Sequence, residues 1–413
     1  MLISGASVAG PALAYWLRRY GYRVTVVEVA PALRGGGFAV DFRGAVQLAV
    51  LERMGVLEVI ESHATCAGTA DAGDAAMRFI DAEGGQLAVL PPEFAGGELE
   101  ILRSDLSRLL HAHSLAPAHG GPAPEYLFRD SLTSLTPTAE GVHATFERSA
   151  PRTFALVIGA DGLHSTMRRL AFGPESDYLS HLGYYVAGWD LPRSAGDLAA
   201  HPVGYNEPGR VVTVGRTPRR AAEPGYAGEV FCVFASDAEL SYDRRNPHSQ
   251  KQAIAHAYQS GGWRTSELLA TLWDADNLYF DSISRVDVPC WSTDGRIVLL
   301  GDAAYGATLG GMGTGSAVIG AYVLAGELAE ADGDAATAFA RYERILRPYV
   351  TPCQQGGRGA GEFLAPLTQQ AIEDRNTTLN DPAAVAAMLQ RGYDISAAIT
   401  LEDYPSHFPA RSR

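Results

Sequence analysis

Residues 296–328 read Arg296-Ile-Val-Leu-Leu-Gly-Asp-Ala-Ala-Tyr-Gly-Ala-Thr-Leu-Gly-Gly-Met-Gly-Thr-Gly-Ser-Ala-Val-Ile-Gly-Ala-Tyr-Val-Leu-Ala-Gly-Glu-Leu328. The pattern predicts a buried strand over 297–300, a glycine-rich loop, and a helix from near Gly313 to about Glu330. Backbone N–H groups can approach a ligand closely where side chains are absent, and a helix N-terminus attracts negative charge. The glycines of this loop and helix start are Gly310, Gly311, Gly313 and Gly315.

This strand, loop and helix therefore predict an anion site, in which Asp302 follows Gly301 at the carboxyl end of the strand. There, Asp302 is well placed to accept a hydrogen bond from a ribityl or ribose hydroxyl. Taken alone, the loop has a second interpretation: a turn that needs glycine only for tight packing.

The amino-terminal residues strengthen the first interpretation. A short strand at Leu2 leads into the turn Gly5-Ala-Ser-Val-Ala-Gly10, a helix is expected over 12–20, and a second strand ends at Glu28. This spacing is the βαβ fingerprint of a dinucleotide site: Gly5 and Gly10 allow the tight turn, the helix start takes the pyrophosphate, and Glu28 takes ribose hydroxyls. Ser7 replaces the usual middle glycine, which leaves the backbone slightly less free to approach the phosphates.

Two more segments fit a nucleotide-binding protein. In 34–44, three consecutive glycines and an alternating apolar run indicate backbone lying against a flat ligand. Residues 154–169 form a second strand, turn and helix, with Asp161-Gly162 at the turn. We also expect helices over 45–60, over 100–110 with Ser104 as a plausible N-cap, and over 335–349 up to Pro352.

The order of these patterns predicts an α/β fold with two domains and a tail. Residues 1–66, 100–174 and 283–333 are expected to form a discontinuous, Rossmann-like cofactor-binding domain with a mixed parallel sheet. Residues 67–99 and 175–282 are expected to form an inserted antiparallel sheet that binds the substrate. Residues 334–413 are expected to be a helical carboxyl-terminal region that buttresses the cofactor domain.

Composition narrows the partners. The chain has 413 residues, 46% hydrophobic composition and a formal net charge of −14, which argues against nucleic acid. Its four cysteines lie far apart, so neither a disulfide framework nor a metal site is expected. No apolar run reaches the roughly 18 residues of a membrane span, and the start at Met1 leaves no room for a signal peptide, so we expect a cytoplasmic protein. The sequence does not indicate an oligomeric state.

Three separated motifs together resemble the class A, single-component flavoprotein monooxygenases, the family of para-hydroxybenzoate hydroxylase, and in particular its tetracycline-inactivating branch. The resemblance covers residues 1 to about 350. The motifs are Gly5 to Gly10 with Glu28, Gly159-Ala-Asp-Gly162 with Ser165 and Arg168, and Gly301-Asp302-Ala-Ala. Two departures are Tyr305, where the family usually has histidine, and the lack of a proline at Thr308-Leu309. In the family these positions lie close to the isoalloxazine ring.

The resemblance implies FAD and NADPH as cofactors and assigns residues to them. The ADP half of FAD would be held by Gly5, Ser7, Gly10 and Glu28. Other FAD contacts would come from Asp41, Arg103, Gly301, Asp302, Gly311 and Gly313. Arg34 would meet NADPH, and Asp161 belongs to a motif that serves both cofactors.

The implied reaction is monooxygenation. NADPH would reduce the flavin, and a flavin C4a-hydroperoxide would insert one oxygen atom from O2 into an aromatic or polyketide-like small molecule. No residue of this chain needs to act as a covalent catalyst, and we name none as a base. A flavin oxidase, a dehydrogenase or a Baeyer–Villiger oxygenase on the same scaffold stays open, as does a non-catalytic flavin-bound protein that sequesters a ligand.

Overall fold

The computed structural model describes residues 1–35, 38–65, 76–117, 121–220, 223–309 and 312–404. Its central layer is a six-stranded sheet in the order β17-β18-β11-β1-β2-β7. All neighbours are parallel except β17, which runs antiparallel to β18. The strands are β1 (Leu2–Ser4), β2 (Thr25–Glu28), β7 (Glu125–Phe128), β11 (Val157–Gly159), β17 (Ser292–Thr293) and β18 (Ile297–Leu299). The inner strands are fully buried, as expected of a parallel sheet covered on both faces.

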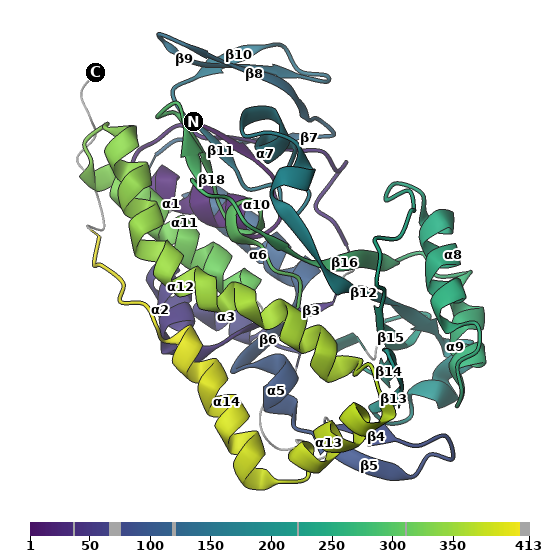
Figure 1. Ribbon diagram of the computed structural model, residues 1–413. Coiled ribbons are helices and arrows are strands. Elements are labelled where there is room, and N and C mark those ends of the chain that lie inside the picture. Colours follow the sequence, from purple (N-terminus) through teal and green to yellow (C-terminus); the bar gives the residue numbers. More distant parts are fainter. Residues whose placement is uncertain (36–37, 66–75, 118–120, 221–222, 310–311, 405–413) are drawn as a thin grey trace.

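Helices cover this sheet in layers (Figure 1). The helix α11 (Gly313–Glu330) packs between α1 (Ala9–Arg19) and α12 (Ala335–Leu364), and this position explains why it is apolar almost all round. Further helices of this half are α2 (Gly44–Met54), α3 (Leu57–Glu61), α6 (Arg103–Leu115), α7 (Thr166–Ala171) and α10 (Asp302–Tyr305). A three-stranded sheet of β8 (Leu132–Thr138), β9 (Gly141–Phe146) and β10 (Arg152–Phe154) lies at the top of the view.

The second half is a seven-stranded sheet in the order β16-β12-β15-β14-β13-β4-β5. It is antiparallel except for the β13–β4 pair. One face is covered by α8 (Pro247–Tyr258) and α9 (Thr265–Leu272), on the outer side in Figure 1. The strands are β4 (Met77–Ile80), β5 (Gln86–Leu90), β12 (Leu179–Pro192), β13 (Val203–Glu207), β14 (Arg210–Gly215), β15 (Tyr226–Ala235) and β16 (Tyr279–Val286).

Smaller elements join the two halves. The antiparallel pair β3 (Ala39–Phe42) and β6 (Leu99–Leu102) lies beside α5 (Pro92–Gly96), and α13 (Gln369–Leu379) and α14 (Pro382–Ser396) follow α12. Short 3-10 helices occur at Glu175–Asp177, Arg193–Ala199 and Pro218–Arg220. The predicted α/β fold with an inserted sheet and carboxyl-terminal helices is confirmed. None of the helices in the described part of the chain is long and apolar enough to cross a membrane.

Three helix predictions were wrong in their bounds. The helix expected over 45–60 is split into α2 and α3, because Gly55 adopts a left-handed φ of 74°. Ser104 is not an N-cap, because strand β6 runs to Leu102 and α6 begins at Arg103. The helix expected to stop at Pro352 continues to Leu364. This helix, α12, contains Pro348 and Pro352, and it buries apolar residues on either side of them, which stabilises it beyond the prolines.

Candidate functional site

The predicted site residues gather at one edge of the six-stranded sheet. Strand β1 lies between β2 and β11, and the chain leaves it towards β2 first and returns to β11 later, so the strand order reverses at β1. Ligands of open α/β sheets bind in the crevice at such a reversal, beyond the carboxyl ends of the strands. Gly5 follows β1, Glu28 ends β2, Asp161 follows β11, and Asp302 follows β18. The topology thus places four residues from distant parts of the sequence at this edge of the sheet, where such a crevice is expected.

The turn between β1 and α1 is closely packed. Gly5 has a φ of +106°, and a Cβ atom there would lie 2.3 Å from the Ala160 carbonyl oxygen. A Cβ atom on Gly10 would lie 1.9 Å from the Gly5 carbonyl oxygen. Glu28 closes the turn, since its two carboxylate oxygens accept hydrogen bonds of 2.9 Å from the Ala6 and Ala30 N–H groups. A carboxylate has about four lone-pair positions, so Glu28 can still accept from hydroxyl groups.

The N-terminus of α1 is suited to an anion. The helix has no side-chain cap and no acidic residue in its first turn. Its first N–H groups, which carry the partial positive charge of the helix N-terminus, can therefore bind an anion. Ser7 is half-buried, and its hydroxyl group lies 3.4 Å both from Ser107 Oγ and from Arg103 Nη2. Arg103, the exposed first residue of α6, therefore brings a positive charge to this helix start.

Asp302 lies at a second helix start. A Cβ atom on Gly313, the first residue of α11, would be 3.2 Å from Asp302 Oδ1. The Asp302 residue is accessible to solvent, yet the many protein atoms that surround its carboxyl group partly desolvate it and raise its pKa. The nearby charge of Arg103 acts in the opposite direction. Arg103 therefore lies near both helix starts.

The loop before α11 is strained on both sides. Leu309 and Met312 have left-handed φ values of 56° and 51° without being glycine, which costs on the order of 1–3 kcal/mol for each residue. Gly311, a predicted site residue, lies outside the described residues. Strain of this kind is concentrated at ligand sites, where the surrounding structure holds it in place.

Asp161 has an internal role. Its carboxylate accepts hydrogen bonds from Ser4 Oγ at 3.2 Å, from the Met167 N–H group at 2.9 Å, and from Ser165 Oγ. Burial raises the pKa of Asp161, and these hydrogen bonds oppose that effect. Asp161 thereby ties β1 to the start of α7, and a direct contact with a cofactor remains a prediction.

The remaining predicted residues lie near the junction of the two halves. Asp41 is on β3, opposite Glu100, and forms an ion pair of 2.7 Å with Arg43. Arg34 is exposed in the loop before β3. It forms no ion pair with any other described residue. Tyr305 is buried, and its hydroxyl donates to the Ser316 carbonyl oxygen at 3.4 Å. The Tyr305 side chain therefore packs under α11 and does not bring a phenol to the crevice.

Sequence reasoning missed an aromatic wall between the halves. Phe38 makes edge contacts with Phe231 and Tyr279 of the seven-stranded sheet, with ring centroids 5.1 and 5.5 Å apart. A Cβ atom on Gly188 would be 1.8 Å from Phe38 Cζ, so glycine makes room for the ring. Burial raises the pKa of Tyr279, and the charges of Arg103 and Asp302 also act on it. The aromatic wall therefore lies near Arg103 and Asp302, and in the sequence only the alternating run that begins at Phe38 pointed to it.

A charged cluster also joins the halves. His164 follows the Asp161-Gly162 turn, and its ring nitrogens lie 3.0 Å from Glu175 Oε2 and 3.0 Å from Asp281 Oδ1 on β16. Arg244 lies against the same histidine and pairs with Glu175 at 2.8 Å. Burial alone would lower the pKa of His164, but the hydrogen bonds to Asp281 and Glu175 outweigh it and raise the pKa to about 9.

We predict a pH-dependent role for His164 in stability. Its pKa in the folded state is above its ordinary value of 6.5, so its contribution is fully present below pH 6.5 and is lost as the pH rises through about 9. His164→Gln should lower the free energy of unfolding at pH 6 by roughly 1–3 kcal/mol and much less at pH 10. Thermal denaturation across this range measures the effect, with the exposed His201→Gln as a control. A deficit that stays constant with pH would contradict the prediction.

Comparisons with known proteins agree with this geometry. A family model described as FAD binding domain matches residues 1–352. A flavin-dependent monooxygenase from an unknown prokaryotic organism is 35% identical over 384 residues, covering 91% of this chain and 94% of the relative. The crystal structures of tetracycline destructases Tet(51) and Tet(55) are 30% and 32% identical, both with a TM-score of 0.80. The matches cover 98% of this chain and 99% and 98% of those chains, respectively.

Proposed function

This chain belongs to the FAD-dependent monooxygenase family, and from that premise we propose that it uses NADPH and O2 to insert one oxygen atom into a flat aromatic or polyketide-like small molecule. The observation that carries the proposal is the arrangement of three features: the uncapped start of α1 beside Arg103, the uncapped start of α11 beside Asp302, and the aromatic wall between the two sheets. Bound FAD supplies the chemistry of O2 activation and oxygen transfer.

The residues present fit FAD. The α1 start with Arg103 suits the pyrophosphate, because partial and full positive charges converge there. Glu28 suits the adenosine ribose, and Asp302 suits the ribityl chain, since each carboxylate can accept from hydroxyl groups. The start of α11 would place positive charge near the flavin ring. Gly5 and Gly10 keep the backbone of the first turn free of side chains.

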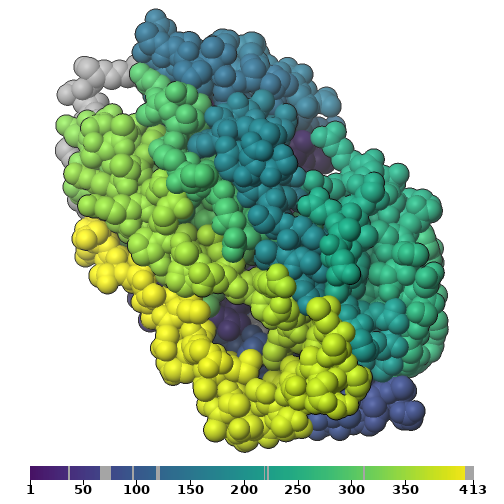
Figure 2. Space-filling view, in the orientation of Figure 1, coloured from purple at the N-terminus to yellow at the C-terminus, as the bar shows by residue number. Residues whose placement is uncertain are grey.

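The protein's own contribution to the reaction is placement of the substrate. Phe38, Phe231 and Tyr279 offer an apolar surface on which a flat substrate can stack. The Tyr279 hydroxyl adds a neutral hydrogen-bonding group, since burial raises the pKa of Tyr279 and keeps its proton on at neutral pH. Figure 2 shows a hollow bordered by the α12–α14 region, with atoms of the amino-terminal part at its floor. Two relatives are named for tetracycline, a flat tetracyclic polyketide, and this favours the same substrate class here.

The test is the mass of the product. FAD-loaded protein is given NADPH and isotopically heavy O2 with a panel of phenolic polyketides, tetracyclines and simple phenols. We expect one heavy oxygen atom in a product from a polycyclic substrate. Peroxide formation with unlabelled products would indicate an oxidase, and NADPH consumption that stays at background with every substrate would indicate a ligand-sequestering protein.

A separate prediction concerns Arg34 and NADPH. Arg34 is exposed beside the triple glycine of 35–37, where it can pair with a phosphate. Arg34→Ala should raise the NADPH concentration needed for half-maximal flavin reduction by roughly tenfold or more, the value of a lost charge-assisted hydrogen bond of about 1.5–3 kcal/mol. Stopped-flow flavin reduction measures this, with the exposed Arg148→Ala as a control. An unchanged NADPH dependence would remove Arg34 from the cofactor site.

A further inference from the structure

A buried arginine far along the chain lacks an acidic partner. Arg375, on α13, is 7% exposed. Its guanidinium donates to Asn376 Oδ1 at 3.0 Å, to the Phe363 carbonyl oxygen at 3.1 Å and to Asn206 Oδ1 at 2.8 Å. All three acceptors are neutral, and no carboxylate among the described residues forms an ion pair with Arg375. A guanidinium has five N–H donors, so two remain for another acceptor.

The positive charge of Arg375 is only partly compensated. Its guanidinium carbon lies 3.7 Å from the centroid of the Phe79 ring, which is a favourable cation–π contact but not an ion pair. Burial lowers the pKa of Arg375 to about 10 with no opposing effect from an acid, so the side chain is still charged at neutral pH. A buried charge without a counter-ion is costly. The buried Arg168, in contrast, has Glu175 at 3.9 Å.

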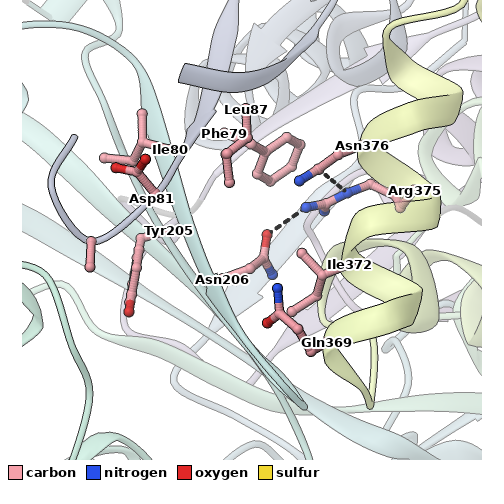
Figure 3. A pocket seen from close by; sticks show the side chains of 11 residues that line it. Phe79, Ile80, Asp81, Leu87, Tyr205, Asn206, Gln369, Ile372, Arg375 and Asn376 are labelled. Atoms are coloured by element: carbon pink, nitrogen blue, oxygen red, sulfur yellow. Dashed lines mark hydrogen bonds between the residues drawn. The ribbon is translucent and has the colours of Figure 1, made fainter. Parts of the chain in front are cut away.

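Arg375 lines a pocket between α13 and the edge of the seven-stranded sheet. The pocket has a volume of about 190 Å³, below the roughly 300–1,000 Å³ of sites for drug-sized ligands. Figure 3 shows Arg375, Asn376 and Asn206 on one side and Asp81 and Tyr205 across from them. The apolar part of the lining comes from Phe79, Ile80, Leu87 and Ile372.

The lining specifies the ligand by its chemistry. The two remaining donors of Arg375 match the two oxygens of a carboxylate. The apolar side chains match a small, flat hydrophobic body. The Asp81 carboxyl group belongs to the same lining, and its Oδ1 accepts hydrogen bonds from the Glu83 and Gly85 N–H groups. A second negative charge on the ligand is therefore unfavourable.

We propose that this pocket binds a small aromatic monocarboxylate, which pairs with Arg375 and bridges α13 to strands β13, β4 and β5 at one end of the seven-stranded sheet. The site is distinct from the crevice at β1, since its residues come from β4, β5, the turn between them, β13 and α13. The ligand supplies the counter-ion that Arg375 lacks within the described residues.

Calorimetric titration of the FAD-loaded protein with benzoate tests the proposal. Benzoate should bind at least tenfold more tightly than benzamide, which has the same shape without the charge, and than acetate, which has the charge without the ring. Isophthalate, with a second carboxylate, should bind more weakly than benzoate. Equal affinity for benzoate and benzamide, or for benzoate and acetate, would overturn the proposal. The flavin absorbance spectrum should not change, because the site is away from the crevice.

Two variants locate the binding. Leu87→Trp fills the pocket from an exposed position, and Leu367→Trp makes the same change at an exposed residue outside the lining. Benzoate affinity should fall at least tenfold in the first variant and stay at the wild-type value in the second. Arg375→Gln should also lose benzoate binding, with circular dichroism to show that it folds. Undiminished binding to Leu87→Trp would place benzoate elsewhere and overturn the proposal.

Discussion

Replacement of Asp302 by alanine is expected to release most of the FAD during purification, with a rise in the FAD dissociation constant of roughly 10–100-fold. That range corresponds to the loss of one hydrogen bond accepted by a charged group, about 1.5–3 kcal/mol. Asp302 makes no side-chain hydrogen bond to another described residue and is exposed, so the fold does not depend on its carboxylate. The apo-protein should therefore keep its thermal midpoint within a few degrees of that of wild-type apo-protein.

The isosteric Asp302→Asn variant is the matched control. Its amide oxygen can still accept from a hydroxyl, so FAD affinity should fall less than in Asp302→Ala. Fluorescence titration of apo-protein with FAD measures both variants, and the absorbance of the purified protein gives the bound fraction. Full retention of the yellow colour in Asp302→Ala would show that this carboxylate does not hold the cofactor.

The crevice could be predicted from the sequence because its parts are local. Each of Gly5, Glu28 and Asp302 lies within a few residues of a strand end, and the carboxyl ends of parallel strands meet at one edge of a sheet. The bounds of α11 also followed directly from the glycine pattern and the apolar run. For these residues, the local sequence pattern and the rule for parallel sheets were sufficient to predict the site.

The features that sequence reasoning missed are those made by tertiary contacts. His164 meets Asp281 across 117 positions of sequence, and Arg375 meets Asn206 across 169. No periodicity joins such residues, because each lies in an ordinary segment of its own element. The passage of α12 through Pro352 has the same cause, since burial of Tyr349 and Cys353 outweighs the local cost of proline.

The last prediction separates local propensity from tertiary contact at two helical glycines. Propensity alone predicts that glycine to alanine stabilises a helix by about 1 kcal/mol. Gly359, on α12, is exposed, and no neighbouring element lies within 4 Å of the position that a Cβ atom would take, so Gly359→Ala should raise the thermal midpoint slightly. Gly10, on α1, is buried, and its Cβ atom would lie 1.9 Å from a backbone oxygen that has no freedom to rotate away.

Gly10→Ala should therefore destabilise the protein by roughly 3 kcal/mol or more, the upper range for overpacking, and should also weaken FAD binding because the turn at Gly5 must move. Thermal denaturation of both variants with and without added FAD measures the two effects. The change in thermal midpoint should have opposite signs in the two variants, because the same substitution should stabilise α12 and destabilise the packing of α1. A Gly10→Ala protein with wild-type stability and FAD content would mean that the close contact between α1 and the turn does not determine the residue at position 10.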